Sequence, residues 1–448
     1  MHTIILGAGI GGLAAAYGLS RISGETYGIF EQQARSGGYC RSQRVDGFTY
    51  DIVSHVLHFR TKDMHNFVRE LLDETLLPLK RRAWIYFRGR YVPYPFQTHL
   101  GSLPPAERAS CLAGYWRAWL NRRRNGLSKP KNFEEWVHLH LGAGIARHFM
   151  FPYNTKLWGK APAELSVDWL RPFIPQISWR EVLGNLVRRK SVSEAGYNAC
   201  FYYPKVGGMQ ELVDRLEARI APVQVNHQAV GVDLERKVVR FQNGQEAHYD
   251  RLISTLPLKT LAFLSTNLPE ELRNDASKLV CTSLLSLVYC CRRPLPHSYH
   301  WLYFPEPQYP FFRIIFPSNI SPSSAPKGCS IISVEISEPD MDRADEMEAS
   351  TRRSLAELGF LLGDSDICSS ERYYFSHAYP VHDLGRSERV SRLAEFFKSR
   401  GVWTIGRFGG WKYSSIDDAI AEGLSTAQEV ASSIPARTRH LTRAAGAD

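Results

Sequence analysis

The chain opens with Met1-His2-Thr3-Ile4-Ile5-Leu6-Gly7-Ala8-Gly9-Ile10-Gly11-Gly12, and this stretch decides its fold. The apolar residues up to Leu6 predict a short buried strand, and residues 13–19 predict a helix. Gly7 permits the tight turn out of the strand, Gly9 lets the backbone approach a pyrophosphate, and Gly12 allows close packing of the helix on the strand. The spacing therefore predicts a dinucleotide-binding loop.

A second apolar strand, at residues 27–30, ends in Glu31. An acidic side chain about 20 residues after the glycines accepts a hydrogen bond from a ribose hydroxyl. Amides at the start of the helix, at Ile10 and Gly11, point toward the phosphates. These features predict a Rossmann-like unit, with a glycine-rich turn that binds no ligand as the alternative.

A glycine pair follows in Gly37-Gly38-Tyr39-Cys40-Arg41-Ser42, and the hairpin after it ends in Tyr50-Asp51. This arrangement resembles flavoproteins of the amine oxidase and protoporphyrinogen oxidase superfamily, whose FAD lies extended with its pyrophosphate on the first helix. The resemblance implies FAD rather than NAD, with Gly38, Arg41, Ser42 and Val225 among its contacts. An ordinary surface hairpin is the alternative interpretation.

The composition is typical of a folded intracellular enzyme. The 448 residues, 44% of them hydrophobic, can bury a large core in two or three lobes. The eight cysteines lack metal-ligand spacing, so we expect reduced thiols and no metal. We find no signal peptide and no apolar run that would span a bilayer, and we therefore expect a cytoplasmic protein without an integral membrane segment.

The net charge of +10 suits nucleic acid, a membrane surface or an anionic small molecule. The densest basic runs are Lys80-Arg81-Arg82 and Arg122-Arg123-Arg124. Because they lack the aromatic interleaving of a nucleic-acid groove, we interpret both as solvated helix faces and expect no nucleic-acid partner.

The predicted fold class is α/β (α+β), a Rossmann-like FAD-binding domain with a helical insertion and an antiparallel-sheet substrate domain. We expect a discontinuous FAD-binding domain at residues 1–60, 200–260 and 395–432, a mainly helical substrate-binding domain at 61–199, an antiparallel sheet domain at 261–394 and a disordered basic tail at 433–448. Asn132 is a predicted helix cap, and Asn243-Gly244 is a predicted hairpin turn.

Four further segments resemble UDP-galactopyranose mutases, above all the eukaryotic branch, and the likeness runs in order over residues 1–430. The segments are Pro93-Tyr94-Pro95-Phe96-Gln97, Phe149-Met150-Phe151-Pro152-Tyr153-Asn154-Thr155-Lys156-Leu157-Trp158, Trp301-Leu302-Tyr303-Phe304-Pro305 and Gly406-Arg407-Phe408-Gly409-Gly410-Trp411-Lys412-Tyr413. The resemblance implies a redox-neutral isomerase in which N5 of reduced FAD attacks the anomeric carbon of a UDP-sugar. The pyranose ring then opens and recloses as a furanose. We also expect an external reductant such as NADPH to reduce the flavin, and a homo-oligomer is possible.

The resemblance also implies roles for particular residues near the flavin. His55 would lie beside the isoalloxazine, and Gly406, Arg407, Asp417 and Asp418 would contact the cofactor. The helix predicted to begin near Ser415 would direct its amides at the pyrimidine end of the ring, where they favour an anionic flavin. A structural histidine at the end of a strand is the alternative for His55.

A diphosphate leaving group requires cationic and phenolic donors. By resemblance these are Arg313, Tyr303, Tyr379 and Tyr413. The predicted substrate-binding set also contains Tyr94, Phe96, Gln97, Tyr153, Asn154, Trp158 and Asn198, several of them for uracil. The alternative is that the aromatic residues of this set belong to the core.

Two positions depart from the family pattern. Phe173 stands where the family carries an arginine that reaches flavin and diphosphate, with Arg171 as the nearest cation, and Thr98 replaces an asparagine after Gln97. We therefore expect UDP-galactose or a related, altered UDP-sugar as substrate. The alternatives are an FAD-dependent oxidoreductase of the amine oxidase or desaturase type and a flavoprotein without catalytic activity.

Overall fold

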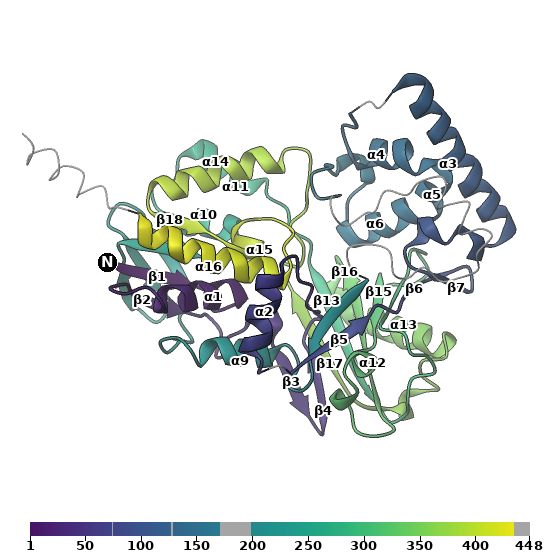
Figure 1. Cartoon of the computed structure of the whole chain (residues 1–448), viewed down its shortest axis with the longest axis horizontal. Helices are drawn as coiled ribbons and strands as arrows, with labels where there is room; N and C mark the ends of the chain where they lie inside the picture. Colours follow the sequence, from purple (N-terminus) through teal and green to yellow (C-terminus); the bar gives the residue numbers. More distant parts are fainter. Residues whose placement is uncertain (74, 127–128, 171–198, 434–448) are drawn as a thin grey trace, which may run out of the picture.

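The computed structural model describes residues 1–73, 75–126, 129–170 and 199–433. Figure 1 shows two lobes: one is built on a parallel sheet near the N-terminus, and the other on a larger sheet with a helical unit at its end. Among the helices that the structure describes, none is both long enough and apolar enough to cross a bilayer.

A four-stranded parallel sheet forms the centre of the first lobe. Its strands, in spatial order, are β18 (Val402–Thr404), β12 (Arg251–Ser254), β1 (His2–Leu6) and β2 (Thr26–Phe30). Ile4, Ile5 and Leu6 of β1 are buried because helices cover both faces, which is the usual environment of parallel strands. The sheet thus joins residues from the beginning, the middle and the end of the chain.

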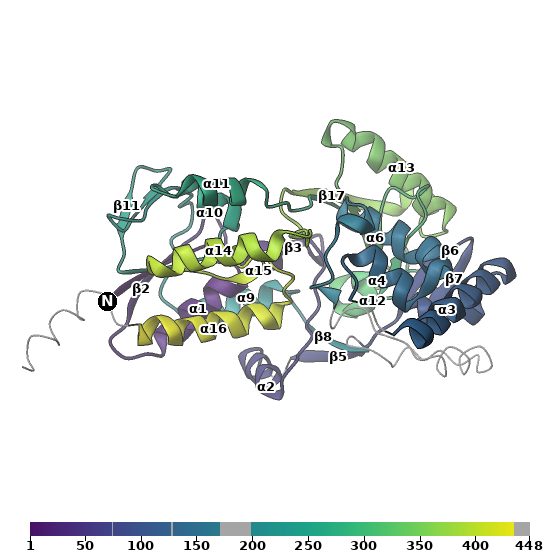
Figure 2. The same ribbon diagram turned by 90° about the horizontal axis from the view of Figure 1, so that it is seen from above.

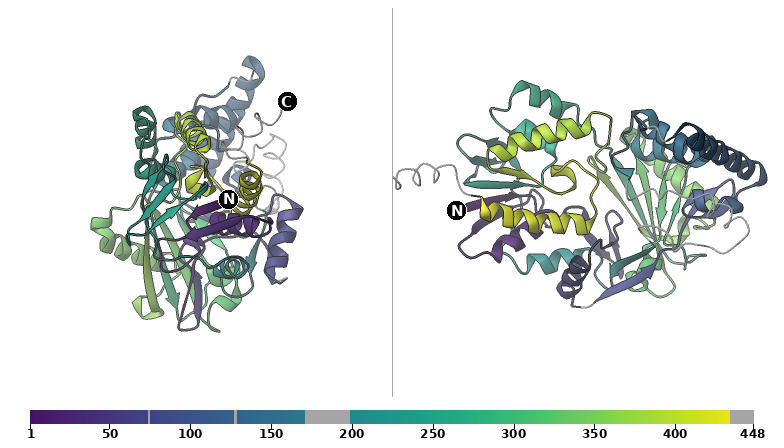
Figure 3. Two further views of the ribbon diagram at one scale, coloured as in Figure 1. Left: turned by 90° about the vertical axis from the view of Figure 1, so that its left-hand side faces the viewer. Right: turned by 45° about the horizontal axis from the view of Figure 1, so that its top comes forward.

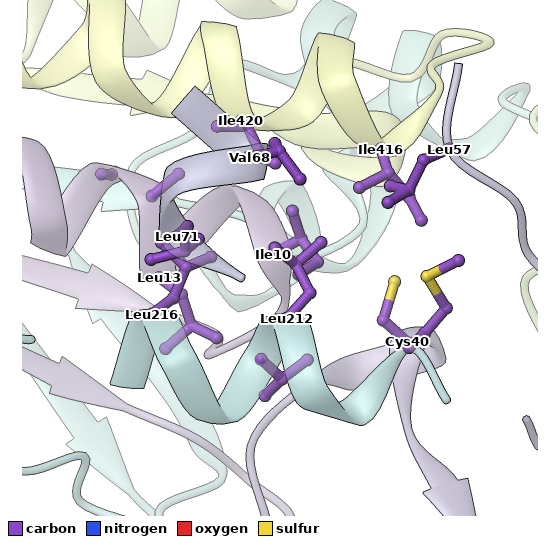
Figure 4. Packing of buried hydrophobic residues seen from close by; sticks show 14 of the residues in the cluster. Ile10, Leu13, Cys40, Leu57, Val68, Leu71, Leu212, Leu216, Ile416 and Ile420 are labelled. Carbon is purple, nitrogen blue, oxygen red and sulfur yellow. The ribbon is translucent and has the colours of Figure 1, made fainter. Parts of the chain in front are cut away.

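Four helices pack together on one face of this sheet. They are α1 (Ile10–Ser20), α2 (Lys62–Leu71), α9 (Gln210–Glu217) and α16 (Ile416–Ser432). Figure 4 shows their apolar side chains meeting, Leu13 with Leu216 and Val68 with Ile420. α1 and α16 run side by side (Figure 2), and a Cβ at Gly423 would lie 2.6 Å from the Gly11 carbonyl oxygen, so this approach requires glycine.

The other face of the parallel sheet is covered by helices and a small antiparallel sheet. These elements are α10 (Leu258–Leu264), α11 (Glu270–Ser277), α14 (Arg386–Ser399), β9 (Ala229–Asp233), β10 (Val238–Phe241) and β11 (Glu246–His248). The predicted turn joins β10 to β11, with Gly244 at a φ of +84°. That prediction is confirmed.

The larger sheet has seven strands in the described residues. Their spatial order is β17 (Ile367–Phe375), β13 (Leu284–Cys291), β16 (Ser330–Ser337), β15 (Arg313–Ile315), β14 (Trp301–Tyr303), β6 (Ala83–Phe87) and β7 (Arg90–Pro93). Neighbours are antiparallel except β14 and β6, which are parallel. The predicted antiparallel sheet is therefore present, and α12 (Pro317–Ile320) and α13 (Ala344–Glu357) lie in its connections.

Strands β6 and β7 differ from the expectation that residues 61–199 are mainly helical. In β6, buried and half-buried residues alternate, which is the period of a strand with one face on a core. Two shorter ribbons pair β5 (Leu76–Lys80) with β8 (Cys200–Pro204) and β3 (Ser42–Val45) with β4 (Phe48–Asp51).

A helical unit closes the β6–β7 end of the large sheet, as the views in Figure 3 show. It contains α3 (Pro105–Asn125), α4 (Phe133–His140), α5 (Gly142–Ile145), a π-helical turn (Ala146–Met150) and α6 (Phe151–Trp158). The predicted cap is confirmed, since the Asn132 side chain accepts a hydrogen bond of 2.9 Å from the Glu135 amide. This packing fixes α6 next to the hairpin β14–β15.

Candidate active site

The glycine loop has the geometry that a pyrophosphate requires. Gly7 has a φ of +93°, and a Cβ at Gly12 would collide with the Gly7 carbonyl oxygen. A Cβ at Gly9 would meet nothing within 4 Å, so this stretch of backbone stands open to a ligand. Glu31, at the end of β2, accepts hydrogen bonds from the amides of Ala8 (2.8 Å) and Gln33 (2.9 Å), which hold its carboxylate beside the loop.

A cavity of about 470 Å³ runs along this loop. The predicted cofactor residues that line it are Gly7, Gly9, Ile10, Gly11, Glu31, Gly38, Arg41, His55, Gly406 and Arg407. The sequence did not indicate His227, Gln228, Thr255 and Pro257, which line the cavity from the second piece of the lobe, residues 200–260. No local motif identifies these four residues.

Four other predicted cofactor residues support the cavity from behind it. Gly12 seats α1 on β1, and Ser42 Oγ donates to Asp51 Oδ1 (2.6 Å). The Val225 carbonyl lies 2.7 Å from Nδ1 of His227, and it is His227 that reaches the cavity. Asp417 is buried, and its Oδ1 accepts from Ser415 Oγ at 2.5 Å.

Helix α16 begins as predicted, after Ser415. Asp418 Oδ2 accepts hydrogen bonds from the Ser415 amide (3.0 Å) and hydroxyl (2.6 Å), which closes a capping box. Asp418 also forms an ion pair with Arg60 (2.9 Å). Asp418 therefore fixes the start of the helix, while Ser415 and Ile416 line the cavity.

A second cavity, of about 200 Å³, adjoins the first. Both are lined by Tyr39, His55, Arg407, Ser415 and Ile416. The predicted phosphate ligands Tyr303, Arg313, Tyr379 and Tyr413 all line this smaller cavity. Trp301 and His58 line it as well and were not predicted.

Arg313 is held by a buried carboxylate. Its Nε and Nη2 donate to Glu335 Oε2 at 2.8 and 2.5 Å, and Glu335 is fully buried on the neighbouring strand β16. Burial alone would lower the pKa of Arg313, but Glu335 and the surrounding tyrosines raise it well above its ordinary value. Arg313 therefore stays charged, with that charge largely matched by Glu335.

Arg407 contacts two of the predicted tyrosines, Tyr379 and Tyr413. The rings of Tyr379 and Tyr413 are parallel within 7° at 6.5 Å, and the guanidinium lies 5.6 and 5.4 Å from their centroids. Its Nε and Nη2 donate to the Ser414 carbonyl (3.1 and 2.7 Å). Burial raises the pKa of Tyr379 to about 12, so its hydroxyl is a neutral donor.

His55 stands half-buried where the two cavities meet. Its Nδ1 lies 3.0 Å from the Val53 carbonyl, which favours the tautomer that is protonated at Nδ1. Burial, and then the charge of Arg407, lower the pKa of His55 to about 3. The imidazole is therefore neutral at physiological pH.

The predicted substrate-binding residues divide into two groups. Tyr94 and Tyr153 lie against Tyr303, with ring centroids 5.1 and 5.4 Å from it. Trp158 is buried 6.0 Å from Tyr379. These three rings therefore pack behind Tyr303 and Tyr379, the tyrosines that line the smaller cavity.

The second group lies in the core. Phe96 is fully buried and stacks on Phe149 at 4.9 Å, so the core alternative holds for it. Asn154 donates to the Met150 carbonyl (2.8 Å) within its own helix, and Gln97 is only 2% exposed. Asn198, Arg171, Phe173 and the tail at 434–448 lie outside the described residues.

The basic runs differ from each other. Arg122, Arg123 and Arg124 form the end of α3, and Arg123 and Arg124 are exposed, as expected for a solvated helix face. Arg81 contradicts that interpretation because it follows strand β5 and is only 6% exposed. It contacts the Tyr94 ring and the Ala199 carbonyl, and no local pattern could indicate the contact with Ala199.

Among the described residues, no group of three or more His, Cys, Asp or Glu side chains is placed to hold a metal ion. The eight cysteines form no disulfides with one another.

Comparison with known proteins agrees with this geometry. The family model "Flavin containing amine oxidoreductase" matches residues 10–431. A solved structure of reduced UDP-galactopyranose mutase superposes with a TM-score of 0.90 and 28% identity, covering 96% of this chain and 95% of that one.

Curated relatives show the same breadth of coverage. A Klebsiella pneumoniae protein described as a probable UDP-galactopyranose mutase is 20% identical over 97% of this chain and 95% of its own length. Protoporphyrinogen oxidase 2 of Arabidopsis thaliana is 22% identical over 96% of this chain and 93% of its own. The family implies a flavin cofactor. The chain belongs to the flavin-containing amine oxidoreductases and, within them, resembles the UDP-galactopyranose mutases along nearly its whole length.

Proposed function

We propose that this protein is a flavin-dependent mutase that interconverts the pyranose and furanose forms of UDP-galactose or a related UDP-sugar. One observation carries the proposal. Arg313, Tyr303, Tyr379 and Tyr413 converge on a cavity that opens, at His55, into the dinucleotide cavity. A diphosphate bound by these groups would place its sugar next to the inner end of an extended FAD.

The residues of the larger cavity fit FAD. The open backbone at Gly9 accommodates a pyrophosphate at the start of α1, and the Glu31 carboxylate lies beside it for a ribose hydroxyl. Arg407 adds a positive charge near the inner end of this cavity. When bound and reduced, for example by NADPH, a flavin supplies a nucleophile for the anomeric carbon.

The chain's own residues support the departure of UDP. Arg313 and Arg407 provide charge-assisted donors for phosphate oxygens, which are stronger than neutral ones. Tyr303 and Tyr379 remain protonated because burial raises the pKa of each, so they donate hydrogen bonds to the same oxygens. The neutral imidazole of His55 can accept a hydrogen bond at Nε2.

The test is turnover of UDP-hexoses by the flavin-loaded enzyme in its reduced and oxidised states. We expect interconversion of a UDP-pyranose and a UDP-furanose, followed by chromatography, only after reduction and without net consumption of reductant. Absence of turnover by the reduced enzyme across the UDP-hexoses would overturn the proposal.

A flavin-dependent oxidase is the second candidate, since the similarity to protoporphyrinogen oxidase 2 extends over 96% of the chain. With oxidised enzyme and oxygen, it predicts one hydrogen peroxide for each two-electron oxidation: one per amine oxidised to an imine, or three per porphyrinogen oxidised to a porphyrin. The same preparation, assayed for peroxide, distinguishes the two functions.

A further inference from the structure

Arg81 is a buried arginine that has no carboxylate partner among the residues that the structure describes. It lies between β5 and β6 and is 6% exposed, and its amide donates to the Ala199 carbonyl (2.9 Å). In the described part of the chain, no Asp or Glu lies within ion-pair distance of its guanidinium. Its neighbour Arg82 is exposed and directs Nε and Nη2 at His300 Nε2 (3.2 and 3.0 Å).

The surroundings of Arg81 only partly compensate for its burial. Its guanidinium lies 4.9 Å from the centroid of the Tyr94 ring, a cation–π contact. A buried guanidinium normally pairs with an anion, because removing it from water is costly. Since none of the described carboxylates pairs with Arg81, its charge points to an anionic ligand.

Arg81 also lies close to the proposed substrate cavity. Tyr94 contacts Tyr303, which lines that cavity. Burial raises the pKa of Tyr303, while the charges of Arg313 and Arg81 lower it, so both arginines act on the same hydroxyl. The charge of Arg313 is already matched by Glu335, whereas that of Arg81 is not.

We propose that Arg81 binds a phosphate oxygen of the nucleoside diphosphate, as a cation additional to Arg313 and Arg407. This inference rests on the proposed function, because it takes a UDP-sugar as the ligand. The positive charge of Arg81 would then stabilise UDP, the leaving group of the proposed reaction.

The test compares UDP with uridine, by calorimetric titration of the flavin-loaded protein. In Arg81→Gln we expect UDP affinity to fall about 10- to 100-fold, the effect of losing a charge-assisted hydrogen bond, with uridine affinity unchanged. Arg81→Lys keeps the charge but not the planar fork, and should lose less. Arg82→Gln, one residue away, should bind UDP as the wild type does.

The outcomes separate this inference from the proposed function. Wild-type affinity for UDP in Arg81→Gln would overturn the role of Arg81 and leave the proposed function intact. Equal losses for UDP and uridine would also overturn it, because a packing defect does not distinguish the two ligands. If the wild-type protein binds no UDP, both the role of Arg81 and the proposed function are rejected. If Arg81→Gln loses its flavin, the affinities of Arg81→Lys for UDP and for uridine are compared in its place, and a loss for UDP alone supports the role of Arg81.

Discussion

At the scale of single residues, the main predicted phosphate ligand already has a partner within the protein. This ligand is Arg313, and a fully buried carboxylate on the next strand takes two of its donors. This pairing means that a substitution of Arg313 acts on folding as well as on binding. A loss of activity in a single variant would therefore not identify a ligand contact.

We predict that Arg313→Met weakens UDP binding about tenfold or more and also lowers the free energy of unfolding by about 3–5 kcal/mol, because Glu335 is left buried and unpaired. The double variant Arg313→Met/Glu335→Gln should recover most of the stability but not the affinity. Denaturant unfolding and UDP titration of the same samples measure both. Recovery of UDP affinity in the double variant would exclude Arg313 as a phosphate ligand.

His55 gives a second residue-scale prediction. Since burial and Arg407 lower its pKa to about 3, the ring should not titrate between about pH 5 and pH 8. Its nitrogen resonances, assigned by their loss in His55→Asn, should stay constant over this range in an NMR titration. A His55 resonance that shifts near pH 6.5, the ordinary pKa of histidine, would contradict the predicted lowering of its pKa.

At the scale of elements, a lysine fixes the hairpin that carries the predicted phosphate ligands. Lys156 of α6 directs Nζ at the carbonyls of Phe304, Glu306, Tyr309 and Phe311, at 2.5–3.3 Å. These residues form the connection between β14 and β15, whose ends bear Tyr303 and Arg313. Helix and hairpin are thus joined next to the smaller cavity.

We predict that Lys156→Met lowers the free energy of unfolding by about 2–4 kcal/mol and weakens UDP binding, because the partly buried carbonyls that share the three donors of Nζ lose them. The control is Lys160→Met, which removes only a surface pair with Glu164 and should cost about 0–1 kcal/mol. Thermal unfolding and UDP titration of both variants measure the two effects. Equal effects of the two variants would count against the role of Lys156.

Elements also show how far the sequence could predict the structure. The glycine loop and the Asn132 cap were predictable because their requirements are local: a left-handed backbone at Gly7 and a side-chain oxygen before a helix. The burial of Arg81 and the assignment of residues 83–87 to the large sheet were not predictable, because both depend on distant contacts. Arg81 contacts Ala199, and residues 83–85 pair with Trp301–Tyr303, more than 200 positions away. Phe96 was placed at the site by its motif, yet it stacks in the helical core.

At the scale of the whole molecule, the flavin lobe depends on a close contact between helices from opposite ends of the chain. α1 and α16 approach so closely at Gly423 that a Cβ there would also lie 2.8 Å from the Cβ of Ala14. The glycine loop at the start of α1 therefore keeps its position only while α16 lies against it.

We predict that Gly423→Ala lowers flavin retention and thermal stability together, because the added methyl group displaces α16 from the glycine loop. Gly363→Ala is the matched control, since a Cβ there meets nothing within 4 Å. Flavin absorbance after gel filtration, with a melting curve, measures both effects. Full flavin content in Gly423→Ala would show that the contact tolerates the extra atom.

The order of the strands in the parallel sheet has a consequence for the synthesis of the chain. β1 and α1 leave a ribosome long before β18 and α16, which complete their surroundings. Until α16 is made, the apolar side of α1, with Leu13 and Ile10, has no α16 to cover it. Cofactor capture is therefore expected to follow the synthesis of α16, so nascent chains stalled before residue 416 should emerge without flavin and depend on chaperones.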